Sequence, residues 1–257
     1  MKDIEREAGF KPTGNFAHAD ARVPAYYRCY YTGRLELPQS YDELRLRKGA
    51  KDGCSLDAKK YDISFYPIEA VASGHAPITE SLAQAPAERV ATVVPHEDFH
   101  QQIRDLSVPL AEAAATLVGF LTARGSGIVT VSRGPALPAE GFDSAARVHA
   151  LPERRALDEK QSLLSGLLEE CAAIQPAPRS FNKCVSASNN AGLAFDYTYT
   201  RYYPLLYQVW SACGQDIKCT IAAIARAPRK RPEAEVVEYF RGLLEAQSRV
   251  FPLRKTF

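Results

Sequence analysis

The sequence predicts an α+β fold that is mainly helical, with a small sheet beside the helices. The segment YDISFYPIEAV at 61–71 alternates and is rich in aromatic and β-branched residues, which is typical of a strand. Three segments, at 110–121, 152–174 and 232–250, have the composition or the apolar spacing of long helices. Helices therefore outweigh strands along the chain.

The chain reads as one domain built from four consecutive stretches. Residues 1–86 form an N-terminal region that contains the strand, and 87–121 form two helices. Residues 122–150 are rich in Gly, Ser and Pro and predict a loop or insertion, and 151–257 form a helical C-terminal part. With 257 residues, of which 46% are hydrophobic, the chain is long enough to bury one sizeable core.

The stretch APAERVATVVPHEDFHQQIRDL at 85–106 predicts a helix, or a strand followed by a helix if Pro95 marks the first helical turn. The next residues, SVP, predict a stop and restart, with Ser107 as N-cap and Pro109 in the first turn of a second helix. Two helices joined by so short a connection are expected to be antiparallel.

The motif H-E-x-x-H occupies residues 96–100 as HEDFH. A chain with five histidines is expected to contain this pattern by chance only roughly 0.007 times. On a helix, His96 and His100 share one face and can present both imidazoles to a single zinc ion. Glu97 is turned about 100° around the axis, where its carboxylate suits a general base better than a ligand.

Catalytic zinc takes three protein ligands, and Glu112 is the predicted third. It lies near the start of the second helix, so an antiparallel pair brings it back beside the histidines. The alternative is that Glu112 is a first-turn glutamate favoured by the helix dipole.

At this point the sequence resembles a known family. HEDFHQQ, with EAAATLVG beginning twelve residues after the second histidine, resembles the HELAHQ…NESFATFV core of a bacterial family of predicted aminopeptidases of the gluzincin type. LPQSYDELR, CSLDAKKYDISFYPIEAVASG and NNAGLAFDYTYTRYYPLL are similar to further segments of that family, so the resemblance covers roughly residues 37–210. It implies a zincin-like core that cleaves peptides, with one zinc per chain held by His96, His100 and Glu112, and Glu97 as base.

The resemblance also suggests residues that contact the substrate. Tyr199 matches a family tyrosine and is the expected donor to the oxyanion, although most rings at helical spacing around it are expected to be core. Asn189 and Asn190 match family positions and either hold substrate backbone or cap the following helix. An aminopeptidase also needs an acid for the free amine, and Glu69 and Glu80 flank the strand.

Two departures from the family motivate a second hypothesis. Pro95 directly precedes His96, and Ala111 replaces the asparagine that usually precedes the third ligand. The alternative is a catalytically weak or inactive zinc-binding protein that acts as an interaction module. A fourth protein ligand would favour this alternative, because closed sites are structural.

Charge and composition exclude some classes of partner. The net charge of +2, from 32 basic and 30 acidic residues, gives no reason to expect nucleic acid. No apolar run reaches the roughly 20 residues of a transmembrane helix. Since MKDIEREAGFKP lacks the apolar core of a signal peptide, the chain as it stands is expected in the cytoplasm, with a periplasmic or exported location, as in relatives, as the alternative. The sequence sets no oligomeric state.

The six cysteines contain no C-x-x-C pair. We therefore expect buried free thiols, with a disulfide across CGQDIKC, between Cys213 and Cys219, as the alternative.

Overall fold

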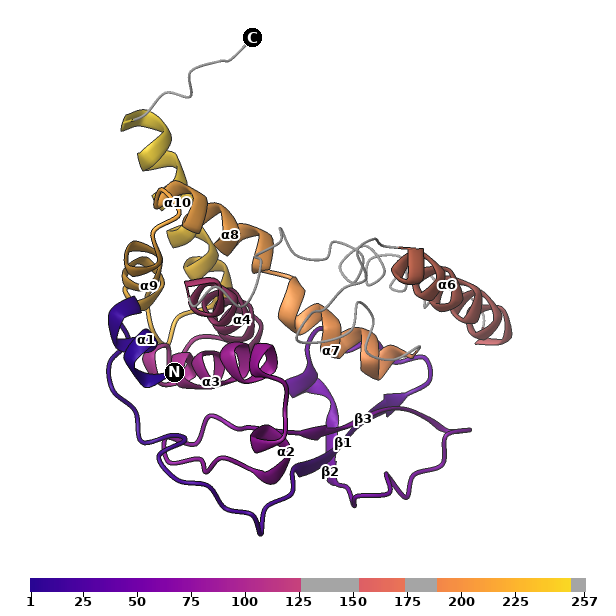
Figure 1. Ribbon diagram of the computed structural model, residues 1–257. Coiled ribbons are helices and arrows are strands. Elements are labelled where there is room, and N and C mark those ends of the chain that lie inside the picture. The colour runs from indigo at the N-terminus through magenta and orange to yellow at the C-terminus, as the bar shows by residue number, and fades with distance from the viewer. Residues whose placement is uncertain (126–152, 174–188, 251–257) are drawn as a thin grey trace.

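The computed structural model describes residues 1–125, 153–173 and 189–250. These residues form a helical body with a small antiparallel sheet on one side (Figure 1). The predicted α+β, mainly helical class is confirmed. Most of the expected loop at 122–150 lies outside the described residues, and its first residues, 122–125, still belong to a helix.

Within the described residues the sheet has three strands in the order β2-β1-β3, with β1 (Tyr26–Gly33) between β2 (Arg45–Lys48) and β3 (Tyr61–Ile68). The strand expected at 61–71 is therefore present and ends three residues earlier. In the antiparallel register, β1 pairs with both neighbours, and successive side chains alternate between the two faces. We call one side the inner face; it carries Arg28, Tyr30, Thr32, Leu46, Lys48, Asp62 and Ser64.

The motif lies in α3 (Ala87–Gln102), which runs without a break through Pro95. Of the two readings of Pro95, the structure supports the continuous helix, and its first residue is Ala87. A proline inside a helix removes one backbone hydrogen bond and costs about 3 kcal/mol. Burial of neighbouring side chains such as Val93, Val94 and Phe99 offsets this cost.

The second helix, α4 (Val108–Gly125), begins directly after Ser107, as expected. The Ser107 carbonyl accepts the amide of Ala111, and the Ser107 hydroxyl donates to Glu233 at 2.6 Å. Gly119 allows α3 and α4 to approach closely, since a Cβ at this position would lie 2.7 Å from the Thr92 carbonyl oxygen and 3.3 Å from the Cβ of His96. The close helix contact therefore lies beside the first histidine of the motif.

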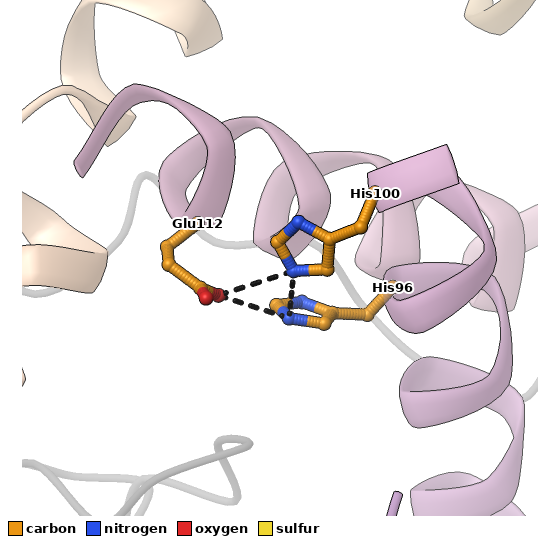
Figure 2. Close-up of side chains that lie close together, drawn as sticks. All are labelled: His96, His100 and Glu112. Carbon is orange, nitrogen blue, oxygen red and sulfur yellow. Dashed lines mark hydrogen bonds and ion pairs between the residues drawn. The ribbon is translucent and has the colours of Figure 1, made fainter. Parts of the chain in front are cut away.

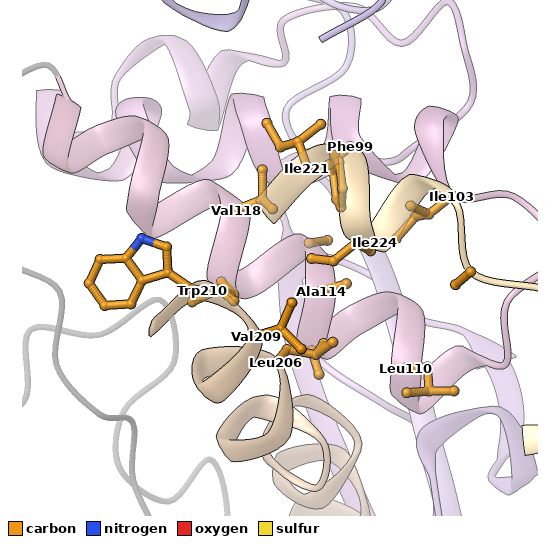
Figure 3. Packing of buried hydrophobic residues seen from close by; sticks show 14 of the residues in the cluster. Phe99, Ile103, Leu110, Ala114, Val118, Leu206, Val209, Trp210, Ile221 and Ile224 are labelled. Carbon is orange, nitrogen blue, oxygen red and sulfur yellow. The ribbon is translucent and has the colours of Figure 1, made fainter. Parts of the chain in front are cut away.

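Five helices follow in the described ranges: α6 (Glu153–Ala173), α7 (Asn190–Thr200), α8 (Tyr203–Ala212), α9 (Ile217–Ala225) and α10 (Glu233–Val250). Shorter elements precede α3: α1 (Lys2–Ala8), the 3₁₀ turn η1 (Tyr41–Glu43) and α2 (Glu80–Ala83). The largest core cluster joins α3 and α4 to α8, α9 and α10 (Figure 3) and includes Phe99, Leu110, Val118, Leu206, Trp210, Ile224 and Phe240. Among the described helices, none is long and apolar enough to cross a membrane.

Asp98 connects the back of α3 to the N-terminal segment. It is fully buried and accepts hydrogen bonds from Asn15 at 2.9 Å and Thr13 at 2.5 Å, and it pairs with the Lys2 ammonium. Glu5 of α1 is also buried and lies 3.5 Å from Lys2. Two carboxylates thus share one lysine behind the motif helix.

The prediction of free thiols is wrong. Disulfides join Cys29 to Cys54 and Cys213 to Cys219, with Cα–Cα distances of 6.0 and 5.7 Å, and Cys171 is also disulfide-bonded. The structure contains no free cysteine among the described residues. The sequence could not show the first of these pairs, because 25 residues separate its cysteines and only the packing of the loop 49–60 against β1 brings them together.

Candidate metal centre

The structure brings the three predicted ligands together (Figure 2). His96 and His100 project from α3 and Glu112 projects from α4. The two Nε2 atoms lie 3.2 Å apart, and Glu112 Oε2 lies 3.2 Å from that of His96 and 3.3 Å from that of His100. Three donor atoms therefore form a nearly equilateral triangle.

The triangle fits a tetrahedral metal ion. Zinc bonds to imidazole nitrogen and carboxylate oxygen are about 2.0–2.2 Å long, which places neighbouring ligand atoms of a tetrahedron about 3.3–3.5 Å apart. Glu112 Oε2 is buried and has no hydrogen bond of good geometry in the described part of the chain, only the two histidine nitrogens nearby. A buried carboxylate oxygen between two imidazoles is a donor set that could hold one metal ion.

Without a metal, these residues hold charge as an ion pair. Burial alone would lower the pKa of His100, but the Glu112 carboxylate outweighs it and raises this pKa to about 9. Burial alone would raise the pKa of Glu112, yet His100 and His96 hold it well below its usual value. A proton therefore occupies the triad where a cation would bind.

Glu97 follows His96 on α3 and is not one of the three clustered ligands. Burial raises its pKa above the usual value, although the nearby His96 and His100 partly counteract the shift. A carboxyl group with a raised pKa, close to a metal centre but outside its ligand set, is suited to exchange protons.

Tyr41 of η1 holds the third ligand in position. Its hydroxyl donates to Glu112 Oε1 at 2.6 Å, so the other oxygen, Oε2, faces the histidines. Its amide donates to the Thr198 hydroxyl at 2.8 Å, and its ring stacks on Phe195 with centroids 5.0 Å apart. Sequence reasoning missed Tyr41, because a tyrosine 71 residues before its partner leaves no spacing signal.

Tyr199 of α7 lies beside the triad. Its ring is half-buried and stacks on His96 with centroids 6.2 Å apart. The same ring contacts Phe195 and Tyr41. The tyrosine expected to act near the metal is thus adjacent to a ligand, and its role as a donor belongs to the proposal below.

Asn189 and Asn190 lie at the other end of α7. Asn189 caps the helix by accepting the Gly192 amide at 2.9 Å, and it also donates to the Ile63 carbonyl of β3. Asn190 donates through its side chain to the carbonyl of Glu36 at 2.8 Å. Nine helical residues, about 13 Å, separate Asn190 from Tyr199. Asn189 therefore caps α7, and Asn190 attaches the start of α7 to the segment around Glu36.

The two acids considered for the substrate's amine have other contacts. Glu69 forms an ion pair with Arg89 of α3 at 2.7 Å, and Glu80 accepts a hydrogen bond from Gln84 at 3.2 Å. Neither joins the triad.

Among the described residues, no fourth His, Cys, Asp or Glu joins the group. Three ligands without a fourth is the arrangement of catalytic rather than closed structural zinc sites. A comparison with models of known protein families finds no match, and comparisons with curated proteins and solved structures find none either. The family resemblance therefore stays a prediction. The structure itself defines an α+β protein with a buried His-His-Glu centre that could hold one metal ion, of the H-E-x-x-H type.

Proposed function

We propose that the protein is a zinc-dependent peptide hydrolase, with aminopeptidase as the favoured activity. The observation that carries the proposal is the triangle formed by His96, His100 and Glu112, with Glu97 next to it on the same helix. Zinc is the metal that this donor set suits best among common ions, and its chemistry there would be Lewis-acid activation of water.

The residues around the centre then have distinct tasks. Glu97 accepts a proton from the water that attacks the scissile carbonyl and passes it to the nitrogen of the leaving amine. Tyr199, whose ring stacks on His96, donates a hydrogen bond to the carbonyl oxygen as negative charge develops on it. Tyr41 keeps Glu112 oriented throughout.

An extended substrate can be held by the edge of the sheet. β3 is an edge strand, and a peptide can add to such an edge through backbone hydrogen bonds. Asn189 already binds the Ile63 carbonyl, so the substrate would pair with the part of β3 that follows Ile63.

The test is the Glu97→Gln variant, loaded with zinc. Because Glu97 does not bind the metal, zinc content and melting temperature should stay at wild-type values, while peptide turnover should fall at least about 100-fold. Glu88→Gln, an exposed change on the same helix, is the matched control and should retain full turnover. Peptides with free and with blocked N-termini should be compared, since cleavage confined to free N-termini identifies an aminopeptidase.

Full activity in zinc-loaded Glu97→Gln would contradict the mechanism. No turnover by the wild type against a broad peptide library would favour the alternative, a zinc-binding interaction module.

A further inference from the structure

Two basic side chains on the inner face of the sheet have no ion-pair partner among the described residues. Arg28 of β1 lies directly opposite Lys48 of β2 in the register. Within the described part of the chain, neither side chain makes a hydrogen bond or an ion pair. Like charges directly opposite one another on neighbouring strands repel and destabilise a sheet. The fold therefore maintains a repulsive pair here.

Basic residues on the other face of the same strand are partnered. Arg45 forms an ion pair with Glu36, and Arg47 donates to the Ser55 carbonyl at 3.2 Å. Of the basic residues in β1 and β2, only those of the inner face, Arg28 and Lys48, thus lack a partner among the described residues. The abundance of basic residues in β2 does not explain this difference, because Arg45 and Arg47 have partners.

Contacts between β1 and α7 show where the pair lies. At one end, the Asn190 amide binds Asp62, which is opposite Thr32 in the register. Further along both elements, the Tyr30 ring contacts the Phe195 ring at 5.1 Å. β1, followed from Thr32 to Tyr30, therefore lies alongside α7, followed from Asn190 to Phe195.

The same alignment continues to the metal centre. Two more strand residues lead from Tyr30 to Arg28, about 7 Å, and four more helical residues lead from Phe195 to Tyr199, about 6 Å. Arg28 is thus level with Tyr199, which stacks on His96. In agreement, the Tyr30 hydroxyl is within electrostatic range of both Arg28 and Glu112; burial raises its pKa, Arg28 lowers it and Glu112 raises it.

We propose that Arg28 and Lys48 form an anion subsite beside the metal centre and that this subsite binds a carboxylate of the peptide substrate. The inference rests on the proposed function and adds a substrate class to it. A guanidinium binds a carboxylate through two parallel hydrogen bonds, and the bound anion relieves the repulsion between the two cations. The carboxylate is either the C-terminal one of a short peptide or that of an acidic side chain.

Calorimetric titration of zinc-loaded Glu97→Gln protein tests the subsite without turnover. The ligands are three tetrapeptides: Ala-Ala-Ala-Ala, its C-terminal amide, and an amide with glutamate at the third position. A carboxylate-bearing peptide should bind about tenfold or more tightly than the amide without a carboxylate, because charge-assisted hydrogen bonds are roughly twice as strong as neutral ones. The two carboxylate-bearing peptides distinguish the C-terminal source from the side-chain source.

Arg28→Gln, added to Glu97→Gln, should abolish this preference, and Lys48→Gln should reduce it. Arg47→Gln removes the same charge from the opposite face of the sheet and should leave the preference intact. Equal melting temperatures of the Arg28 and Arg47 variants verify the fold. Equal binding of acid and amide, or equal losses in the Arg28 and Arg47 variants, would overturn the subsite.

The outcome for the subsite is separate from that for catalysis. If metal-loaded wild type hydrolyses the acid and amide peptides with equal kcat/KM, the hydrolase stands and the subsite fails. If nothing is hydrolysed but the carboxylate preference depends on Arg28, the subsite stands and the hydrolase fails.

Discussion

Glu112 uses its two carboxylate oxygens differently. Oε1 accepts the Tyr41 hydroxyl, while Oε2 faces His96 and His100. Partners of this kind fix the orientation of a ligand, and their removal typically costs 10–100-fold in metal affinity. The tyrosine is itself immobilised by Thr198 and Phe195, so the orientation of Glu112 depends on α7 as well as on α4.

Tyr41→Phe should therefore weaken zinc binding by about 10–100-fold, measured by competition with a chromophoric chelator. The ring and its stacking remain, so the melting temperature of the metal-free protein should change little. Tyr30→Phe removes a hydroxyl from the same aromatic cluster and serves as the control. Equal zinc affinity of Tyr41→Phe and wild type would show that Glu112 needs no support from the hydroxyl.

Metal binding should release a proton at neutral pH. The pKa of His100 in the metal-free triad is about 9, so the residue is protonated at pH 7 and must lose this proton to bind a metal. Zinc affinity should therefore rise about tenfold per pH unit from pH 7 toward pH 9. Calorimetric titration in two buffers of different ionisation enthalpy counts the protons released, and a count near zero at pH 7 would contradict the ion-paired triad.

The sequence reveals the ligands but not the residues around them. His96, His100 and Glu112 follow from helical spacing and a short connection, which are local properties. Tyr41 comes from a distant segment, and only the packing of η1 against α7 brings it near the centre. The position inferred for Arg28 likewise depends on the packing of β1 against α7. Only the family resemblance pointed to Tyr199, because its spacing does not distinguish it from the neighbouring aromatic residues.

At the level of elements, the α3–α4 contact depends on a missing side chain. A Cβ at Gly119 would overlap the Thr92 carbonyl oxygen, which is backbone and cannot turn away. The first metal ligand, His96, lies one turn further along α3, so any separation of the helices there displaces the centre.

Gly119→Ala should destabilise the protein by about 1–3 kcal/mol and weaken zinc binding. Gly242→Ala in α10 meets no atom within 4 Å and should instead stabilise by about 0.5–1 kcal/mol, because alanine is the better helix former. Urea denaturation of both variants gives the comparison. If both substitutions changed the free energy of unfolding in the same direction, the close contact at Gly119 would not limit stability.

Glu5 makes stability depend on pH. Burial and the neighbouring Asp98 raise its pKa from 4.5 to about 7. Between these values the folded state holds a proton that the unfolded state releases, so the free energy of unfolding falls as pH rises through this window. Glu5→Gln should remove that slope and, at pH 8, stabilise by up to about 3 kcal/mol.

Denaturation of Glu5→Gln and of Glu7→Gln, an exposed change on the same helix, at pH 5 and pH 8 measures this effect. Parallel pH profiles for wild type and Glu5→Gln would show that the pKa of Glu5 is not raised in the folded protein.

The long helices α3, α4, α6 and α10 and one strand, β3, were predictable. The alternation at 61–71 located β3, and the helical pattern located α3, α4, α6 and α10. Pro95 left the start of α3 open, because proline is compatible with a first turn and also with a helix interior when packing offsets its cost. β2, with its exposed sequence RLRK, carries no buried alternation, and only its pairing with β1 makes it a strand.

In the whole molecule, covalent links tie down segments that the main core does not hold. The disulfide between Cys29 and Cys54 fastens the loop 49–60 to the central strand, and that between Cys213 and Cys219 closes the turn from α8 to α9. Full pairing of the described cysteines is typical of proteins that fold in an oxidising environment.

The two disulfides should contribute unequally. In the chain-entropy model, closing the loop of 25 residues stabilises by about 3.5 kcal/mol and closing the loop of 6 by about 2 kcal/mol. The double variant Cys29→Ala/Cys54→Ala should therefore unfold at lower urea concentration than Cys213→Ala/Cys219→Ala. The reverse order would show that local packing outweighs loop length.

The three ligands all lie within residues 96–112, on two helices joined by a short connection. Contacts this close in sequence close early in folding, because little chain entropy is lost in forming them. The helical hairpin can therefore capture a metal while the sheet is still unassembled, and the bound ion then favours the antiparallel pairing of α3 and α4. The contact between Tyr41 and Glu112 spans 71 residues, so it costs more chain entropy and is expected to form later. The nascent chain would thus acquire its ion first and the tyrosine that holds Glu112 in place afterwards.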